Sequence, residues 1–127
     1  METLTAFFLA ASIQYNLPSG LLESLCYVES KHNITAVHED DGGSDSLGVC
    51  QVKIETAQLM GFEGTEVELM DPKVNIFIAA AYLSHQLHRY GDVTKAVIAY
   101  NRGSAGMLTS TAYSNKVMQT WGKYEQH

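Results

Sequence analysis

Residues 71–91 constrain the fold more than any other part of this 127-residue chain. The segment begins with Asp71-Pro72, a typical helix N-cap followed by a residue favoured at the first helical position, and it ends at Gly91, a common helix terminator. Between these ends, residues 76–83 read Ile-Phe-Ile-Ala-Ala-Ala-Tyr-Leu and are apolar on every side. A helix that is apolar all round lies in the middle of a domain. We therefore expect a mainly helical fold built around this segment.

Helical patterns occur on both sides of the central segment. We expect further helices at 3–15, at 20–30 with Ser19 as N-cap, at 55–60 closed by Gly61, at 94–100, and in a last stretch with Tyr113, Val117 and Trp121 on one face. Residues 47–52 are β-prone, and the acidic run 39–45 indicates a solvated loop. Because no repeat or long linker divides the chain, we expect residues 1–127 to form a single domain with at most a small β element.

Charge excludes some partners. The net charge is -6 and no basic run occurs, so nucleic acid and anionic membrane surfaces are not expected partners. The apolar run 4–11 follows Glu2 instead of a positively charged segment and is too short to span a bilayer. We expect this run to be the first helix of the domain, and we expect neither membrane insertion nor a secretion signal.

A carboxylate occupies a position that a helix normally gives to an apolar residue. The core-facing stripe of the second helix, spaced i, i+3, i+4 and i+7, consists of Leu22, Leu25, Cys26 and Glu29. Glu29 also lies in the last turn, where the helix dipole disfavours negative charge. Both effects raise its pKa, which suits a general acid working near neutral pH. The alternative is a glutamate that turns to solvent at a frayed helix end.

Polar residues end apolar segments at two other places. Gln51 follows the β-prone run, and Tyr100-Asn101 ends the helix expected at 94–100. Side chains at the ends of elements can line a shared cleft. The two cysteines, Cys26 and Cys50, are too few for a disulfide framework or a zinc site. We interpret them as small buried hydrophobic residues, and the sequence leaves open whether they pair.

Four segments in order carry a resemblance to a known family. They are Glu29-Ser30, Ser-Leu-Gly-Val-Cys-Gln at 46–51, Ala-Ala-Tyr-Leu at 80–83 and Ala-Tyr-Asn-Arg-Gly at 99–103. With the Asp71-Pro72 helix start and the late segment 113–117, the chain resembles the lytic transglycosylases of the soluble-lytic-transglycosylase type from about residue 10 to residue 121. It departs from them at 48–51, where the family usually has Gly-Leu-Met-Gln. The loop before this block is also longer and more acidic, and a proline usual after the glutamine is absent.

The resemblance implies a lysozyme-like helical fold with a groove for a glycan strand of peptidoglycan, and it implies no cofactor or metal. Glu29 would protonate the glycosidic oxygen between N-acetylmuramic acid and N-acetylglucosamine. As a carboxylate it would then take the proton from the muramyl C6 hydroxyl, which attacks the anomeric carbon and yields a 1,6-anhydro end without water. A single carboxyl group suffices for such an intramolecular attack, whereas ordinary glycosidases need two.

The resemblance also implies roles for residues around Glu29. Gln51 resembles the residue that binds near the substrate acetamido group, and Tyr100 resembles the tyrosine that hydrogen-bonds the catalytic carboxyl group. Ser46 and Asn101 match motif positions that bind substrate. Ser30 matches a motif position as well, and helix capping is the alternative role for Ser30 and Asn101.

Two other classes of function remain open. The first is a muramidase of the goose-type lysozyme kind, which would use water and take its base from the acidic loop 39–45. The second is a non-catalytic wall-binding module, against which Glu29, Gln51 and Tyr100 together argue. The biological setting that fits a wall enzyme without a signal is a phage lysin, a virion-associated domain or part of a larger phage or secretion assembly.

Three other features have structural interpretations. His85 and His88 share a helix face but lack a third ligand, so no metal site is expected there. Tyr82 is expected in the core, although its motif places it near the groove. Trp121 is expected to close the core as part of an apolar stripe, not to serve as a sugar platform.

Overall fold

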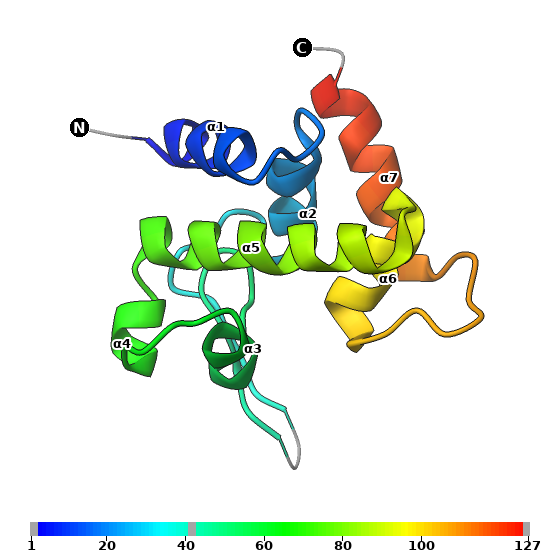
Figure 1. Ribbon diagram of the computed structural model, residues 1–127. Coiled ribbons are helices and arrows are strands. Elements are labelled where there is room, and N and C mark those ends of the chain that lie inside the picture. The colour runs from blue at the N-terminus through cyan, green and yellow to red at the C-terminus, as the bar shows by residue number, and fades with distance from the viewer. Residues whose placement is uncertain (1–2, 41–42, 126–127) are drawn as a thin grey trace.

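The computed structural model describes residues 3–40 and 43–125, and these are mainly helical as expected (Figure 1). The helices are α1 (Leu4–Gln14), α2 (Leu21–Ser30), α3 (Ile54–Leu59), α4 (Glu66–Leu69), α5 (Pro72–Tyr90), α6 (Val93–Arg102) and α7 (Ala112–Glu125). Two short antiparallel strands, β1 (Val37–His38) and β2 (Ser46–Leu47), form the small β element. Asp41 and Gly42, in the acidic loop, lie outside the described residues.

Helix α5 is the central element, as its apolar sequence predicts. It packs against α1, α2, α3, α4 and α6, and Figure 1 shows α1 and α2 on one side of it and α3 and α4 on the other. The Asp71 side chain accepts a hydrogen bond from the Val74 N–H, and Gly91 ends the helix in the left-handed region with φ of 64°. The predicted N-cap and terminator of this helix are confirmed.

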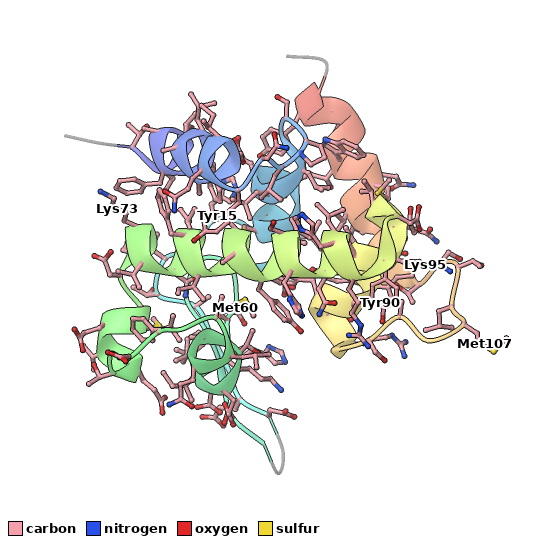
Figure 2. All side chains as sticks on the ribbon, in the orientation of Figure 1. Tyr15, Met60, Lys73, Tyr90, Lys95 and Met107 are labelled. Atoms are coloured by element: carbon pink, nitrogen blue, oxygen red, sulfur yellow. A yellow bond between two sulfur atoms is a disulfide. The ribbon has the colours of Figure 1, made fainter. Side chains whose placement is uncertain are left out.

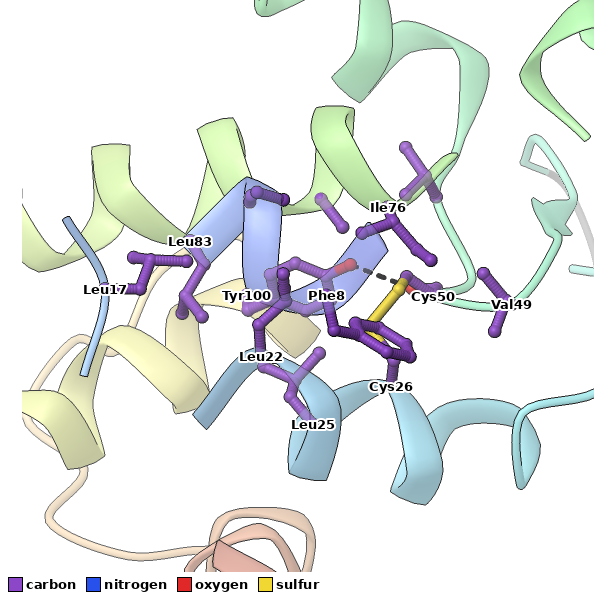
Figure 3. Packing of buried hydrophobic residues seen from close by; sticks show 14 of the residues in the cluster. Phe8, Leu17, Leu22, Leu25, Cys26, Val49, Cys50, Ile76, Leu83 and Tyr100 are labelled. Carbon is purple, nitrogen blue, oxygen red and sulfur yellow. Dashed lines mark hydrogen bonds between the residues drawn. A yellow bond between two sulfur atoms is a disulfide. The ribbon is translucent and has the colours of Figure 1, made fainter. Parts of the chain in front are cut away.

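The main core lies between α5 and the helices α1, α2, α6 and α7 (Figure 3). Phe8 enters it from α1, Leu22 and Leu25 from α2, and Leu83 from α5. The apolar run near the amino terminus is therefore the first helix of the fold, as expected. Within residues 3–40 and 43–125, no helix combines the length and apolarity that crossing a bilayer requires.

The β-prone run at 47–52 is mostly a tight turn, which corrects the expectation of a strand there. Leu47 and Val52 exchange backbone hydrogen bonds of 2.9 and 3.0 Å, and the Gln51 N–H donates to the Gly48 carbonyl. Gly48 has φ of 79°, and a Cβ atom added there would lie 2.6 Å from the Asn75 side chain. Only glycine combines this backbone conformation with such a close approach. The turn 48–51 then leads directly into α3.

One local prediction was wrong, and one short helix was missed. The N-cap of α2 is Gly20, in the left-handed region, and not Ser19. The Ser19 carbonyl instead accepts a hydrogen bond from the Trp121 indole N–H at 2.8 Å, which joins α7 to the start of α2. Helix α4 was not expected, although Thr65 and Glu68 form a capping box at its start. Because α4 is a single turn, it has too little periodicity to be recognised from an apolar stripe.

Cys26 and Cys50 form a disulfide, a pairing that the sequence left open. Both are fully buried, as their apolar surroundings predict. The bond joins α2 to the turn 48–51 across 24 residues of sequence. It therefore ties together the two segments that carry Glu29 and Gln51.

The disulfide gives the first testable prediction. In the chain-entropy account, a cross-link over 24 residues contributes about 3 kcal/mol to the free energy of unfolding. We expect the paired variant Cys26→Ala/Cys50→Ala to lose about this amount in urea denaturation. A reductant should lower the stability of the wild-type protein similarly and leave the variant unaffected. If the reductant leaves the wild-type midpoint unchanged, the cysteines are not bonded in the folded protein.

Candidate active site

A cavity of about 220 Å³ brings together all five residues that the sequence singled out, namely Glu29, Ser46, Gln51, Tyr100 and Asn101. Tyr82, which was expected in the core, also lines the cavity. The wall further contains five residues that were not predicted as site residues, namely Val52, Lys53, Thr56, Arg102 and Gly103. The groups come from the ends of α2, β2 and α6, from the turn 48–51, and from the faces of α3 and α5. The placement of side chains at the ends of elements is what assembles this cavity.

Glu29 emerges from the last turn of α2, as its position in the apolar stripe predicts. The helix ends at Ser30, and the next residue, Lys31, adopts the left-handed region with φ of 54°. Burial raises the pKa of the Glu29 carboxyl group from 4.5 to about 7, and a hydrogen bond from Tyr113 partly opposes this rise. The group is therefore about half protonated at neutral pH, which is the condition a general acid needs.

The hydroxyl group that bonds Glu29 belongs to Tyr113 and not to Tyr100, so that part of the resemblance does not hold here. Tyr113, in α7, donates from Oη to Glu29 Oε2 at 2.6 Å. Tyr100 is buried and donates instead to the Cys50 carbonyl at 2.8 Å (Figure 3). Tyr113 was visible in the sequence as the first residue of the α7 stripe. That stripe faces α2, because α7 packs closely against it.

Gln51 is held in place through its amide nitrogen. Its backbone is in the left-handed region with φ of 53°, unusual for a residue with a side chain. Its Nε2 donates to the carbonyl oxygens of Ala36 and Gly48 at 3.1 and 2.9 Å. The amide oxygen Oε1 accepts no hydrogen bond from any residue that the structure describes. It is therefore the group of Gln51 left to accept a hydrogen bond from a ligand N–H.

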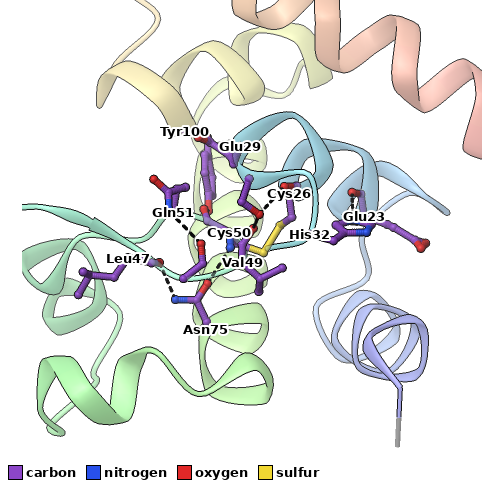
Figure 4. The surroundings of a disulfide bond; sticks show 12 residues. Glu23, Cys26, Glu29, His32, Leu47, Val49, Cys50, Gln51, Asn75 and Tyr100 are labelled. Carbon is purple, nitrogen blue, oxygen red and sulfur yellow. Dashed lines mark hydrogen bonds between the residues drawn. A yellow bond between two sulfur atoms is a disulfide. The ribbon is translucent and has the colours of Figure 1, made fainter. Parts of the chain in front are cut away.

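The turn that carries Gln51 is held by a fully buried amide, Asn75 in α5 (Figure 4). Asn75 Oδ1 accepts from the Cys50 N–H at 2.8 Å, and its Nδ2 donates to the carbonyl oxygens of Leu47 and Leu69, both at 2.9 Å. The Ser30 hydroxyl donates to the Val49 carbonyl at 2.6 Å. Ser30 thus ties the end of α2 to the turn 48–51, a structural contact other than the helix capping that was the alternative to substrate binding.

Glu29 is the only carboxylate among the described residues that line the cavity. Asp40, from the acidic loop, pairs at 2.8 Å with Lys53, and this contact lowers the Asp40 pKa. Glu55 accepts a hydrogen bond from Ser44. Both carboxylates are therefore engaged with partners, and neither lines the cavity.

His85 and His88, on α5, are engaged in contacts other than metal binding. His85 stacks on Tyr82, and His88 Nδ1 lies 2.8 Å from the Ser84 carbonyl oxygen. Over residues 3–40 and 43–125, no three His, Cys, Asp or Glu side chains gather closely enough to hold a metal ion.

The fold and the site together define a helical domain with one acidic group in a polar cavity. The family model of the transglycosylase SLT domain matches residues 6–120. The chain therefore belongs to the transglycosylase SLT domain family.

Three relatives illustrate the range of the family. The chain is 35% identical over 114 residues to a transglycosylase of Enterobacteria phage PRD1, covering 87% of this chain and 40% of that protein. It is 32% identical over 98 residues to protein IpgF of Shigella flexneri, covering 75% and 64% respectively. It is 28% identical over 117 residues to membrane-bound lytic murein transglycosylase E of Buchnera aphidicola subsp. Acyrthosiphon pisum, covering 81% and 51%. The chain thus spans between about two fifths and two thirds of these relatives.

The hydrogen bond from Tyr113 gives the second prediction. Because this bond stabilises the carboxylate, Tyr113→Phe should raise the Glu29 pKa by about one unit, roughly the value of a hydrogen bond to a charged group. Tyr100→Phe is the matched control, because its hydroxyl bonds the Cys50 carbonyl. NMR titration of the isotope-labelled glutamate side chain measures both. A shift in the Tyr100 variant alone would contradict the observed contacts.

The raised pKa gives the third prediction, on stability. The pKa of Glu29 is 4.5 in the unfolded chain and about 7 in the folded one. Its ionisation therefore costs no stability below pH 4.5 and lowers the free energy of unfolding as the pH rises toward 7. Glu29→Gln removes this loss. We expect the variant to match the wild type at about pH 4 and to exceed it by on the order of 1–3 kcal/mol at about pH 8.

Urea denaturation at the two pH values measures this difference. A gain of equal size at both values would show that the substitution acts through packing and not through the charge of Glu29.

Proposed function

We propose that this chain is a peptidoglycan lytic transglycosylase that cleaves the bond between N-acetylmuramic acid and N-acetylglucosamine and leaves 1,6-anhydro ends. The observation that carries the proposal is the single carboxyl group in the cavity, Glu29, with a pKa of about 7. Membership of the SLT family and similarity to a murein transglycosylase support the same substrate. We also propose that residues 1–127 act on the bacterial cell wall as one catalytic domain, alone or within a larger phage or secretion assembly.

In this mechanism Glu29 acts twice. Protonated, it donates to the glycosidic oxygen as the bond to the anomeric carbon breaks. Ionised, it removes the proton from the muramyl C6 hydroxyl as that oxygen attacks the same carbon. A pKa near the working pH suits both steps, since the group must give and take a proton with similar ease. The Tyr113 hydroxyl keeps the carboxyl group oriented through both.

The other cavity residues position the sugar. The free Oε1 of Gln51 is placed to accept the acetamido N–H, since its Nε2 is held by two backbone carbonyls. Ser46 and Asn101 offer polar groups at the cavity wall. Tyr100 lies at the wall with its hydroxyl engaged, so we assign it ring contact with the substrate and support of the turn.

The hydrolytic alternative needs a second group to activate water. Glycosidases of that kind place two carboxyl groups about 5–10 Å apart across the scissile bond. No carboxyl group in the described part of the acidic loop lines the cavity, and Asp40 is held by Lys53. The contacts therefore favour the reaction that needs no second carboxylate.

The fourth prediction concerns the products. Digestion of peptidoglycan by the wild-type protein should release muropeptides with anhydro ends, which are lighter than reducing ends by one water and are separated by mass spectrometry. Glu29→Gln should abolish release while the protein stays folded. An Asp40→Asn/Asp45→Asn variant should stay within about tenfold of the wild-type rate, since a general base contributes about a hundredfold or more.

Two outcomes would contradict this function. Reducing ends together with a hundredfold loss in the Asp40→Asn/Asp45→Asn variant would identify a hydrolase. Unchanged release by Glu29→Gln would remove the glutamate from the mechanism altogether.

A further inference from the structure

The cavity differs in charge from the chain as a whole. The sequence has 14 acidic and 8 basic residues, giving a net charge of -6. The described cavity wall, in contrast, contains two cations, Lys53 and Arg102, and one carboxyl group, that of Glu29. With its pKa raised to about 7, Glu29 is largely neutral below neutral pH. The cavity is then a cationic site in an acidic protein.

The two cations are in different situations. Lys53 Nζ lies 2.8 Å from Asp40 Oδ2, so a carboxylate already neutralises its charge. Arg102, in the last turn of α6, is exposed and lines the same cavity. Within residues 3–40 and 43–125, its guanidinium group makes no ion pair and donates no hydrogen bond to another residue. Its planar set of N–H donors therefore remains available for a ligand.

A purely structural role for Arg102 would be to stabilise the carboxyl end of α6 through the helix dipole. Other groups already serve that end. Gly103 closes the helix by donating its N–H to the Ala99 carbonyl at 2.7 Å. Arg89, from α5, donates to the Gly103 carbonyl at 3.0 Å. The termination of the helix therefore does not explain why an arginine lines the cavity at this position.

We propose that Arg102 binds a carboxylate of the substrate beside Glu29 and makes the site selective for anionic glycan. This proposal rests on the proposed function. Peptidoglycan carries carboxylates that a neutral polymer of N-acetylglucosamine lacks, either on the lactyl group of peptide-free N-acetylmuramic acid or on the stem peptides. Arginine and carboxylate pair in a bidentate geometry. Such a contact also supplies local attraction where the net charges of protein and substrate repel.

The test measures binding in the inactive Glu29→Gln protein, so that no ligand is consumed. The three ligands are glycan strands stripped of peptide, strands that keep their stem peptides, and neutral N-acetylglucosamine oligomers, each titrated by calorimetry. Adding Arg102→Ala should weaken binding of carboxylate-bearing strands about tenfold, as expected for one lost charge-assisted contact, and leave the neutral oligomers unchanged. Arg102→Lys should restore part of the loss, because it keeps the charge without the planar fork.

Lys95→Ala is the matched control. Lys95 lies on the same helix as Arg102 but outside the cavity wall (Figure 2), and its replacement by alanine removes the same charge. It should leave all three affinities within about twofold, because Lys95 does not line the cavity. A loss confined to the stripped strands assigns the contact to the lactyl carboxylate, and a loss confined to the peptide-bearing strands assigns it to the stem peptide. A loss for both kinds of strand means that Arg102 binds either carboxylate.

Two results would overturn the proposal: unchanged affinity of both anionic strands in the Arg102→Ala protein, or an equal loss for the neutral oligomers. The second result would mean that Arg102 contacts the sugar ring and not an anion. Because the proposed function is tested by the products of the active enzyme, either proposal can fail while the other stands.

Discussion

The site depends most on the hydrogen bonds of one buried side chain, that of Asn75. The turn 48–51 has no regular structure of its own, so its backbone groups need partners from elsewhere. Asn75 supplies one acceptor and two donor bonds to the turn and its surroundings. An aspartate there would lose both donor bonds, and an alanine would leave buried backbone groups unpaired, at about 1–3 kcal/mol each. The central helix thus reaches the active site through one amide.

Other contacts converge on the same turn from different elements. The disulfide reaches it from α2, the Tyr100 hydroxyl from α6, and the Ser30 hydroxyl from the end of α2. Together they fix the backbone that leads into Gln51 relative to Glu29. Figure 4 shows Asn75, Gln51 and Tyr100 around the disulfide. The left-handed backbone of Gln51 persists because so many contacts determine it.

The protonation of Glu29 follows from a balance of two opposing effects. Burial at the carboxyl end of a helix disfavours the charged form, and the Tyr113 hydroxyl favours it. Burial is the larger effect, so the pKa ends near neutrality and not near 4.5. A second hydrogen bond to the carboxylate would lower the pKa of Glu29 toward its ordinary value. The Tyr100 hydroxyl does not have this effect, because it donates to the Cys50 carbonyl.

Features that depend on neighbouring residues, such as helix ends, could be predicted from the sequence. Contacts between distant segments could not. The ends of α5 followed from Asp71, Pro72 and Gly91, because caps act within one turn of the chain. The burial of Glu29 followed from helical periodicity. The disulfide did not, because the pairing of two cysteines depends on how α2 packs against a turn 24 residues away. The choice between Tyr100 and Tyr113 likewise depends on the angle of α7, which periodicity does not give.

The residues that hold the site and those at its rim belong to different environments. Asn75 and both cysteines are fully buried, whereas Asn101 and Arg102 are exposed at the end of α6. Exposed side chains are usually replaced at a cost within about 0.5 kcal/mol, while buried ones are not. If the proposed roles hold, substitutions at the exposed rim can alter glycan binding without disturbing Glu29, the proposed acid. Recognition and chemistry can evolve at separate rates within a single cavity.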